Sequence, residues 1–153
     1  MRQTLDEIDV ESIRKSAEEY YREGEFYCSE AIVSSFIEEL DLDLSRDVVA
    51  MMSGFPVGIG GSGCTCGAIS GAVAMLGYFF GRREPGASGA ARTMELTAEL
   101  HDRFIEEEGS TCCRVLTAGM DFDRGEHLEQ CIEFTGRMAA LTAEIIKREN
   151  GID

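Results

Sequence analysis

GFPVGIGGSGCTCGAISGAVAMLGYFFG is the sequence of residues 54–81, and this stretch decides the fold that we expect for the chain. It opens with a glycine-rich loop, continues through Cys64 and Cys66 at a turn, and ends in an uncharged segment with small residues on one side and bulky residues on the other. No charged residue occurs between Asp47 and Arg82, although the rest of the chain is dense in charge. Such a segment is expected to be buried. The stretch therefore predicts a core helix with a thiol site at its N-terminus.

The length and the cysteine content indicate a single domain in a reducing compartment. A chain of 153 residues can bury a hydrophobic core without needing disulfides or a metal to fold, so we expect residues 1–153 to form one domain. The N-terminal sequence, MRQTLDEIDVES, has neither the basic region nor the apolar region of a secretory signal peptide. The six cysteines are therefore more typical of a metal or redox site in the cytoplasm than of a disulfide framework.

The charge balance argues against two classes of function. The chain carries 14 lysines and arginines against 29 aspartates and glutamates, and its formal net charge is −15. Nucleic-acid binding depends on patches of cations, so we expect no nucleic-acid partner. The longest uncharged run, 48–81, is interrupted by Pro56 and by glycines, and its helical part is shorter than the roughly 20 apolar residues that cross a membrane. We therefore expect no membrane insertion.

Apolar residues recur at helical spacing through most of the chain, and no segment alternates clearly enough to predict a strand. Ser29 is the expected N-cap of the second helix. The expected helices are 7–23, a segment from Cys28 or Ser29 to about Leu40, a segment capped by Ser45 that ends before Gly54, 67–80, 90–108, a short helix within 111–119, and a last helix from about Leu128 to Lys147. This pattern predicts an all-α bundle of about five main helices plus a short helix, with the glycine-rich loop before the central helix.

The cysteines are concentrated at the beginnings of the predicted helices. Cys28, Cys66 and the pair Cys112 and Cys113 fall at helix starts, and Cys131 lies on the apolar face near the start of the last helix. Free backbone N–H groups and the helix dipole favour anions there, which lowers the pKa of a thiol towards the thiolate form. A single cysteine is also often buried as a small hydrophobic residue. Four at such positions favour a thiolate site.

The contexts of four cysteines carry a resemblance to a known family. They are Cys28 in YCSEAI, Cys66 in CGAISG after the glycine-rich loop, Cys113 in GSTCCRVL and Cys131 in EQCIEF. In this order they resemble the family of redox-active proteins named for a C–GCAxxG–C–C arrangement of cysteines, over about residues 12–146. The resemblance implies an all-helical fold and redox activity. A related domain occurs in split-Soret cytochromes, where an iron–sulfur centre has been associated with it.

Two further cysteines leave the ligand set open. Cys64 could replace Cys66, and Cys112 could replace Cys113, because each lies within two residues of the position that matches the family. Adjacent side chains in a helix point in different directions, so at most one of Cys112 and Cys113 is expected to face a common site. We take Cys28, Cys66, Cys113 and Cys131 as the redox thiols and metal ligands.

Several kinds of thiol chemistry fit this set. An iron–sulfur cluster is the sharpest interpretation, because four thiolates in a hydrophobic surround are what such a centre uses. Zinc in a four-sulfur site is an alternative, although the CxxC knuckles of structural zinc sites are missing. Metal-free thiol–disulfide exchange, through a pair such as Cys64 and Cys66 or Cys28 and Cys66, is another. The chain could also be a non-catalytic partner, or one component of an oxidoreductase.

An electron-transfer protein needs a partner, and the acidic composition suits a redox partner protein with a basic surface. Exposed apolar faces on the first or last helix would also suit a homodimer. His127 precedes Cys131 by four residues, so both side chains could reach one metal, but we interpret His127 as a surface residue near an acidic loop. The spacing of Gly58, Gly60 and Gly63 matches a dinucleotide-binding pattern, but no βαβ context surrounds it.

Overall fold

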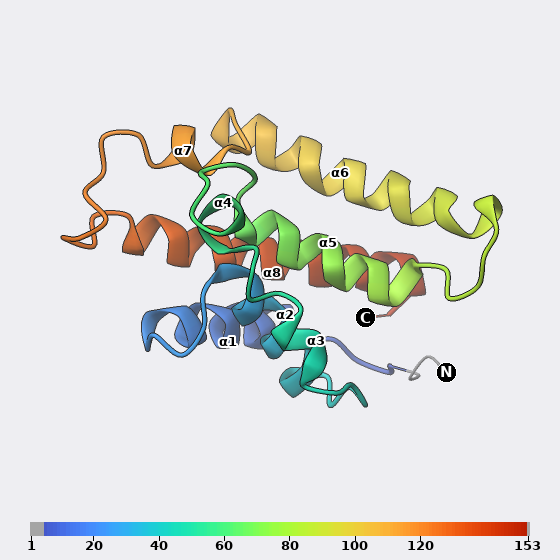
Figure 1. Ribbon diagram of the computed structural model, residues 1–153. Helices are drawn as coiled ribbons and strands as arrows, with labels where there is room; N and C mark the ends of the chain where they lie inside the picture. The colour runs from blue at the N-terminus through green and yellow to red at the C-terminus, as the bar shows by residue number, and fades with distance from the viewer. Residues whose placement is uncertain (1–4, 153) are drawn as a thin grey trace.

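The computed structural model describes residues 5–152 and confirms the all-α prediction, because these residues form helices and no strand (Figure 1). The helices are α1 (Val10–Arg22), α2 (Cys28–Glu39), α3 (Asp47–Ala50), α4 (Pro56–Ile59), α5 (Gly67–Phe80), the 3₁₀ turn η1 (Ala87–Ala90), α6 (Ala91–Glu108), α7 (Cys113–Leu116) and α8 (Leu128–Asn150). Five of them, α1, α2, α5, α6 and α8, have 12 residues or more. None of the described helices is long and apolar enough to cross a membrane.

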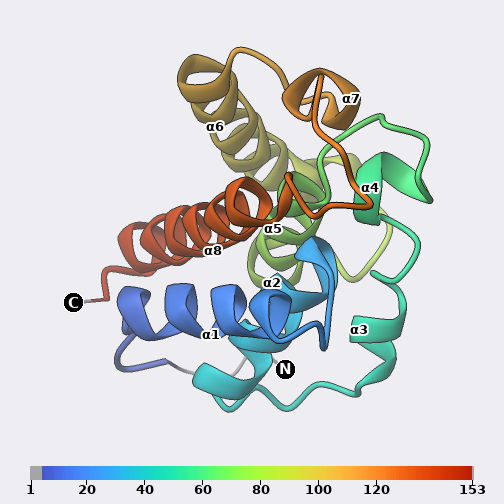
Figure 2. The ribbon, with the colours of Figure 1, turned by 90° about the vertical axis from the view of Figure 1, so that its left-hand side faces the viewer.

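The central helix α5 packs between α2, α6 and α8, and α1 lies along α8 and α2 (Figures 1 and 2). Its small residues allow a close approach to α2. A methyl group on Gly71 would lie 2.8 Å from the backbone oxygen of Ser29. Large side chains such as Phe36, Met75 and Phe104 are fully buried in the core of the bundle. The close packing places the N-terminus of α5 beside the N-terminus of α2, and each of these ends carries a cysteine.

Two local predictions near the N-terminus of α2 are corrected. Ser29 is not an N-cap, because it lies inside the first turn, is fully buried, and donates its hydroxyl to the carbonyl of Met52 at 2.9 Å. The helix instead begins after Tyr27, whose backbone N–H donates to Glu30 Oε1 at 3.2 Å. The third helix is also shorter than predicted and spans only Asp47–Ala50. The hydrogen bond of Ser29 ties the turn that follows α3, at Met52, onto α2.

The glycine-rich loop folds into a left-handed turn that sequence patterns did not predict. Residues 57–61 all have positive φ, from 55° at Val57 to 82° at Gly61. A β-branched residue rarely adopts such a conformation, and one residue of this kind costs about 1–3 kcal/mol. Gly58 is required here, because a methyl group on it would lie 2.3 Å from the backbone nitrogen of Cys64. The loop thus closes tightly on the first cysteine that follows it.

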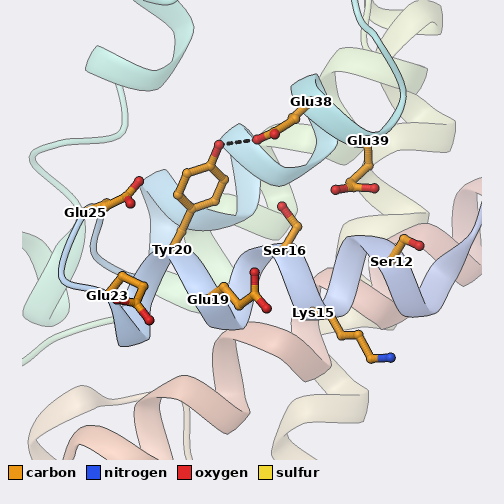
Figure 3. Close-up of a pocket in the computed structure, with 9 residues that line it drawn as sticks. All are labelled: Ser12, Lys15, Ser16, Glu19, Tyr20, Glu23, Glu25, Glu38 and Glu39. Atoms are coloured by element: carbon orange, nitrogen blue, oxygen red, sulfur yellow. Dashed lines mark hydrogen bonds between the residues drawn. The ribbon is translucent and has the colours of Figure 1, made fainter.

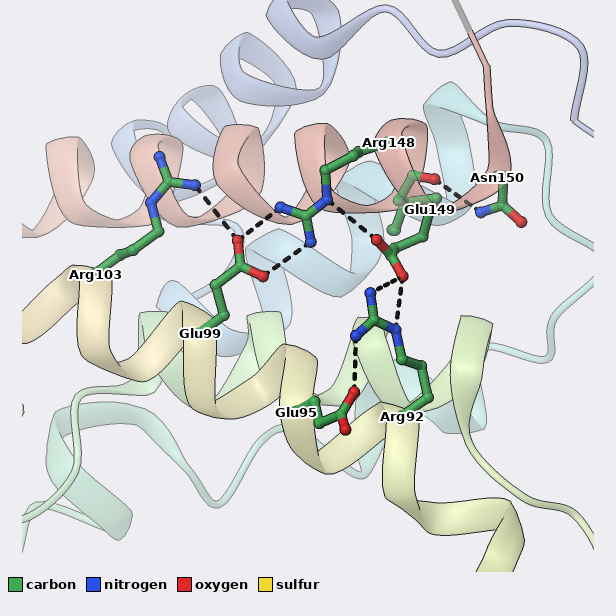
Figure 4. A network of polar contacts seen from close by, with 8 residues as sticks. Arg92, Glu95, Glu99, Arg103, Arg148, Glu149 and Asn150 are labelled. Atoms are coloured by element: carbon green, nitrogen blue, oxygen red, sulfur yellow. Dashed lines mark hydrogen bonds and ion pairs between the residues drawn. The ribbon is translucent and has the colours of Figure 1, made fainter.

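At the other end of the bundle, ion pairs join α6 to α8 (Figure 4). Both terminal nitrogens of Arg148 donate to the carboxylate of Glu99 at 2.8 Å. The Nε of Arg92 donates to Glu149 at 2.7 Å. These contacts hold the C-terminal end of α8, and Arg137 of α8 pairs with Glu107 and Glu108 at the other end of α6, nearer the cysteines.

Candidate functional site

Four cysteines from four separate segments line one small cavity of about 30 Å³. Cys28 comes from the first turn of α2, Cys66 from the N-cap of α5, Cys113 from the start of α7 and Cys131 from the first turn of α8. They are the four cysteines that the sequence singled out as ligands. The fold therefore brings these four residues together, and their role remains a prediction.

The remaining two cysteines do not line the cavity. Cys64 is exposed, and its sulfur lies 4.0 Å from the hydroxyl of Thr65. The thiol of Cys112 donates to the carbonyl of Gly63 at 3.1 Å. Both side chains are thus directed elsewhere, so neither takes the place of its neighbour in the wall of the cavity.

A missing side chain lets Cys28 approach the start of α5. A methyl group on Gly67 would lie 2.3 Å from the Cys28 sulfur, which is far closer than two such atoms can approach. Any residue other than glycine at this position would push the Cys28 sulfur or the helix aside. The absence of a side chain at Gly67 therefore lets the Cys28 thiol lie directly against the first residue of α5.

Backbone pairing brings Cys66 and Cys113 together across the chain. Thr65 and Cys112 form an isolated antiparallel bridge. The N–H of Cys66 donates to the carbonyl of Thr111 at 2.8 Å, and the N–H of Arg114 donates to the carbonyl of Gly63 at 3.0 Å. The N–H of Cys113 donates to the carbonyl of Cys64 in the same way. This short pairing had no signal in the sequence, because it involves only a few residues of two loops.

Burial raises the pKa of all four cavity thiols, contrary to the lowering expected at helix starts. Loss of hydration raises the pKa of Cys66 and of Cys131 to about 11 and also raises the pKa of Cys28 and Cys113. Negative charge on Cys66, Cys113 or Cys131 would further raise the pKa of another member of the group. The helix N-termini are present, but desolvation outweighs their effect. The four thiols are therefore neutral near pH 7 in the absence of a cation.

Tyr21 and His127 belong to the same cavity wall. Tyr21, from α1, lies in this wall with Cys131, and burial raises the pKa of its hydroxyl, with the nearby Cys131 thiol as a further cause. No spacing in the sequence relates Tyr21 to a cysteine, so this contact could not be predicted.

His127 is half-buried and lines the cavity, so the interpretation as a surface residue describes only part of its environment. His127 is the N-cap of α8, and its ring stacks on Phe122 with centroids 3.9 Å apart. Its Nδ1 is buried and has no hydrogen-bond partner among the described residues. The spacing of four residues to Cys131 was the signal that could have placed it in the site.

The cavity is separated from the surface by a thin wall. Val57, Cys113 and Phe122 line the cavity on one side and, on the other, an open hollow of about 340 Å³ beside the glycine-rich loop and α7. Within residues 5–152, no three His, Cys, Asp or Glu side chains are already arranged around a single metal position. Although the four thiols line one cavity, ligation of one ion would therefore require their side chains to rearrange.

A second hollow of different character lies between α1 and α2 (Figure 3). It has a volume of about 480 Å³ and is lined by five glutamates, one lysine and polar residues. The Tyr20 hydroxyl donates to Glu38, and this bond raises the pKa of Tyr20 to about 12. No cysteine or histidine lines this acidic groove, so it is chemically separate from the thiol cavity.

Comparison with known proteins agrees with the arrangement of the cysteines. The model of the family described as "Putative redox-active protein (C_GCAxxG_C_C)" matches residues 26–145. An uncharacterized protein of Archaeoglobus fulgidus is 31% identical over 124 residues, which cover 74% of this chain and 82% of that protein. No solved structure matches the chain. With all four patterned cysteines inside the matched region, the chain belongs to the C_GCAxxG_C_C family of redox-active proteins.

Proposed function

We propose that Cys28, Cys66, Cys113 and Cys131 hold an iron–sulfur cluster that transfers single electrons. One observation carries this proposal: four thiols from four segments line one cavity, whereas the other two cysteines lie outside it. Cysteine thiolates are the common protein ligands of such clusters. When bound, a cluster of this kind accepts and donates one electron at a time.

The electrostatics of the cavity favour a bound cation. Four buried thiols would not lose their protons together, because each negative charge would be poorly hydrated and close to the others. A metal ion supplies the compensating positive charge and displaces the protons. Metal-free thiol–disulfide exchange fits less well, since the attacking species is a thiolate and burial holds these thiols in the neutral form.

The size of the cavity gives zinc support as a second candidate. A volume of about 30 Å³ corresponds to roughly one water molecule, and so to the room for one metal ion. A cluster of several atoms needs more space. The wall made by Val57, Cys113 and Phe122 would have to move outwards, and the hollow of about 340 Å³ behind it provides that space. Metal analysis therefore has to distinguish a single zinc ion from an iron–sulfur cluster.

The acidic surface supports a basic redox partner protein. With a net charge of −15, the chain would attract a positively charged partner over a long range and repel other acidic proteins. The acidic groove between α1 and α2 provides one region of concentrated negative charge. The partner would supply the electron to the centre or receive the electron from it.

The proposal is tested by measuring iron, acid-labile sulfide and zinc per chain in protein purified without oxygen, together with a visible absorption spectrum. We expect stoichiometric iron and sulfide and absorption bands that bleach on reduction. Replacing Cys66 by Ser should abolish the centre, and the matched variant Cys112→Ser should keep it, because Cys112 lies outside the cavity.

Three outcomes would contradict the proposal in different ways. Stoichiometric zinc without sulfide would establish the second candidate. Equal metal content in the wild type and in Cys66→Ser would contradict the ligand assignment. Metal-free protein whose thiols oxidise reversibly would instead favour thiol–disulfide chemistry.

A further inference from the structure

We propose that His127 is a fifth donor of the thiol cavity, and that its Nδ1 competes with the Cys113 thiol for one position on the metal. This inference rests on the proposed metal centre and adds a ligand of a different chemical type to it. His127 lines the same cavity as the four thiols, although the cysteine pattern of the family does not include it.

The first argument is the unpaired nitrogen. The Nδ1 of His127 is buried without a hydrogen-bond partner among the described residues, while Phe122 covers one face of the ring. An unsatisfied buried polar atom costs about 1–3 kcal/mol, so a native fold is expected to provide it with a partner. A metal ion in the adjacent cavity would be such a partner, since imidazole nitrogen is a common metal ligand.

The second argument is the position of His127 relative to Cys131. The carbonyl of His127 accepts the Cys131 N–H at 3.0 Å, which is the hydrogen bond that begins α8. Residues four apart on a helix project from the same face, one above the other. Both line the cavity, so the start of α8 presents a sulfur and a nitrogen donor together.

The third argument identifies the thiol that His127 would replace. A tetrahedral metal takes four of five available donors. Cys28 is packed against Gly67, and Cys66 is buried at the start of the central helix. Cys113 instead lies on a helix of only four residues and also lines the outer hollow. It is therefore the ligand that can leave with the least disturbance of the core.

The experiment uses ¹¹³Cd²⁺ as the probe, because cadmium is a thiophilic ion whose nucleus couples to a nitrogen bound to it. Cys113→Ser protein labelled with ¹⁵N-histidine is expected to bind one cadmium per chain and to show cadmium coupling at His127 Nδ1. Adding His127→Gln should lower the cadmium affinity by about 100-fold or more, because loss of even an outer-shell partner of a ligand costs about 10- to 100-fold. The matched control is His101→Gln, since the chain has only two histidines and His101 is exposed on α6.

Each result decides one question. Cadmium bound to Cys113→Ser without coupling to His127, or with an affinity that His127→Gln leaves unchanged, would overturn the assignment of His127 while the thiolate centre stands. A wild-type chain that binds no cadmium would contradict the proposed metal centre itself. Cys113→Ala provides a second variant for the same measurement, and the helical circular dichroism of each variant checks that it is folded.

Discussion

Replacing Gly67 by alanine is the most direct test of how the fold positions the Cys28 thiol. The added methyl group would lie 2.3 Å from the Cys28 sulfur, whereas ordinary contacts begin near 3.4 Å, so the two atoms have to separate by about 1 Å. The added methyl group would also lie 3.4–3.5 Å from the backbone of Pro56 and Phe55, so the start of α5 has little free space in which to shift. Overpacking of this kind costs about 1–3 kcal/mol. We expect destabilisation of that size and a lower metal affinity.

Gly77→Ala is the matched control, because it lies in the same helix and its methyl group would meet nothing within 4 Å. Alanine is the better helix former by about 1 kcal/mol, so this variant should be more stable than the wild type. Urea unfolding of the metal-free proteins, followed by circular dichroism, measures both changes. In a Cys28→Ala background the cost of Gly67→Ala should largely disappear, since the clashing sulfur is gone. A Gly67→Ala protein as stable as Gly77→Ala, with wild-type metal affinity, would refute the reasoning.

Three further outcomes follow from other contacts. Gly71→Ala should lower the free energy of unfolding by about 1–3 kcal/mol in urea titration, because its methyl group would lie 2.8 Å from the backbone oxygen of Ser29. Hydrogen bonds from Arg148 hold the pKa of Glu99 below its usual 4.5, so this stabilisation is present above about pH 4.5 and is lost as the pH falls. Arg148→Gln should therefore lower stability by about 0.2–1 kcal/mol at pH 7 and by less at pH 3. Iodoacetamide should alkylate Cys64 before the cavity cysteines, as peptide mass mapping over time would show.

Periodic patterns were sufficient to predict the long helices, because an amphipathic or fully apolar face repeats many times in each of them. The central helix is the clearest case: the uncharged segment 67–80 was predicted and α5 spans Gly67–Phe80. The two short helices were predicted from capping residues instead of from periodicity, and both are shorter than predicted. α3 and α7 have four residues each, and their limits depend on tertiary contacts such as the hydrogen bond from Ser29 to Met52.

The cavity could be predicted only in part. The four cysteines were singled out because they fall at or near predicted helix starts. Helical spacing, however, does not indicate which loops approach one another. The bridge between Thr65 and Cys112 and the contact of Tyr21 with Cys131 arise from the packing of distant segments. The predicted lowering of the thiol pKa values was wrong for the same reason, because the degree of burial, which raises them, is a property of the whole fold.

The two sides of the thiol cavity are built differently, and this bears on where the proposed centre would meet its partner. The inner side is fixed by close packing, with Cys28 against Gly67 and Cys66 buried. The outer side consists of the strained Val57 in the glycine-rich loop, the one-turn helix α7 and Phe122 of the loop between α7 and α8. Segments bordering the outer hollow expose the apolar side chains of Ile59 and Val115, each about half exposed. Because electron transfer requires a short path to the partner, the proposed centre would exchange its electron through the thin outer wall.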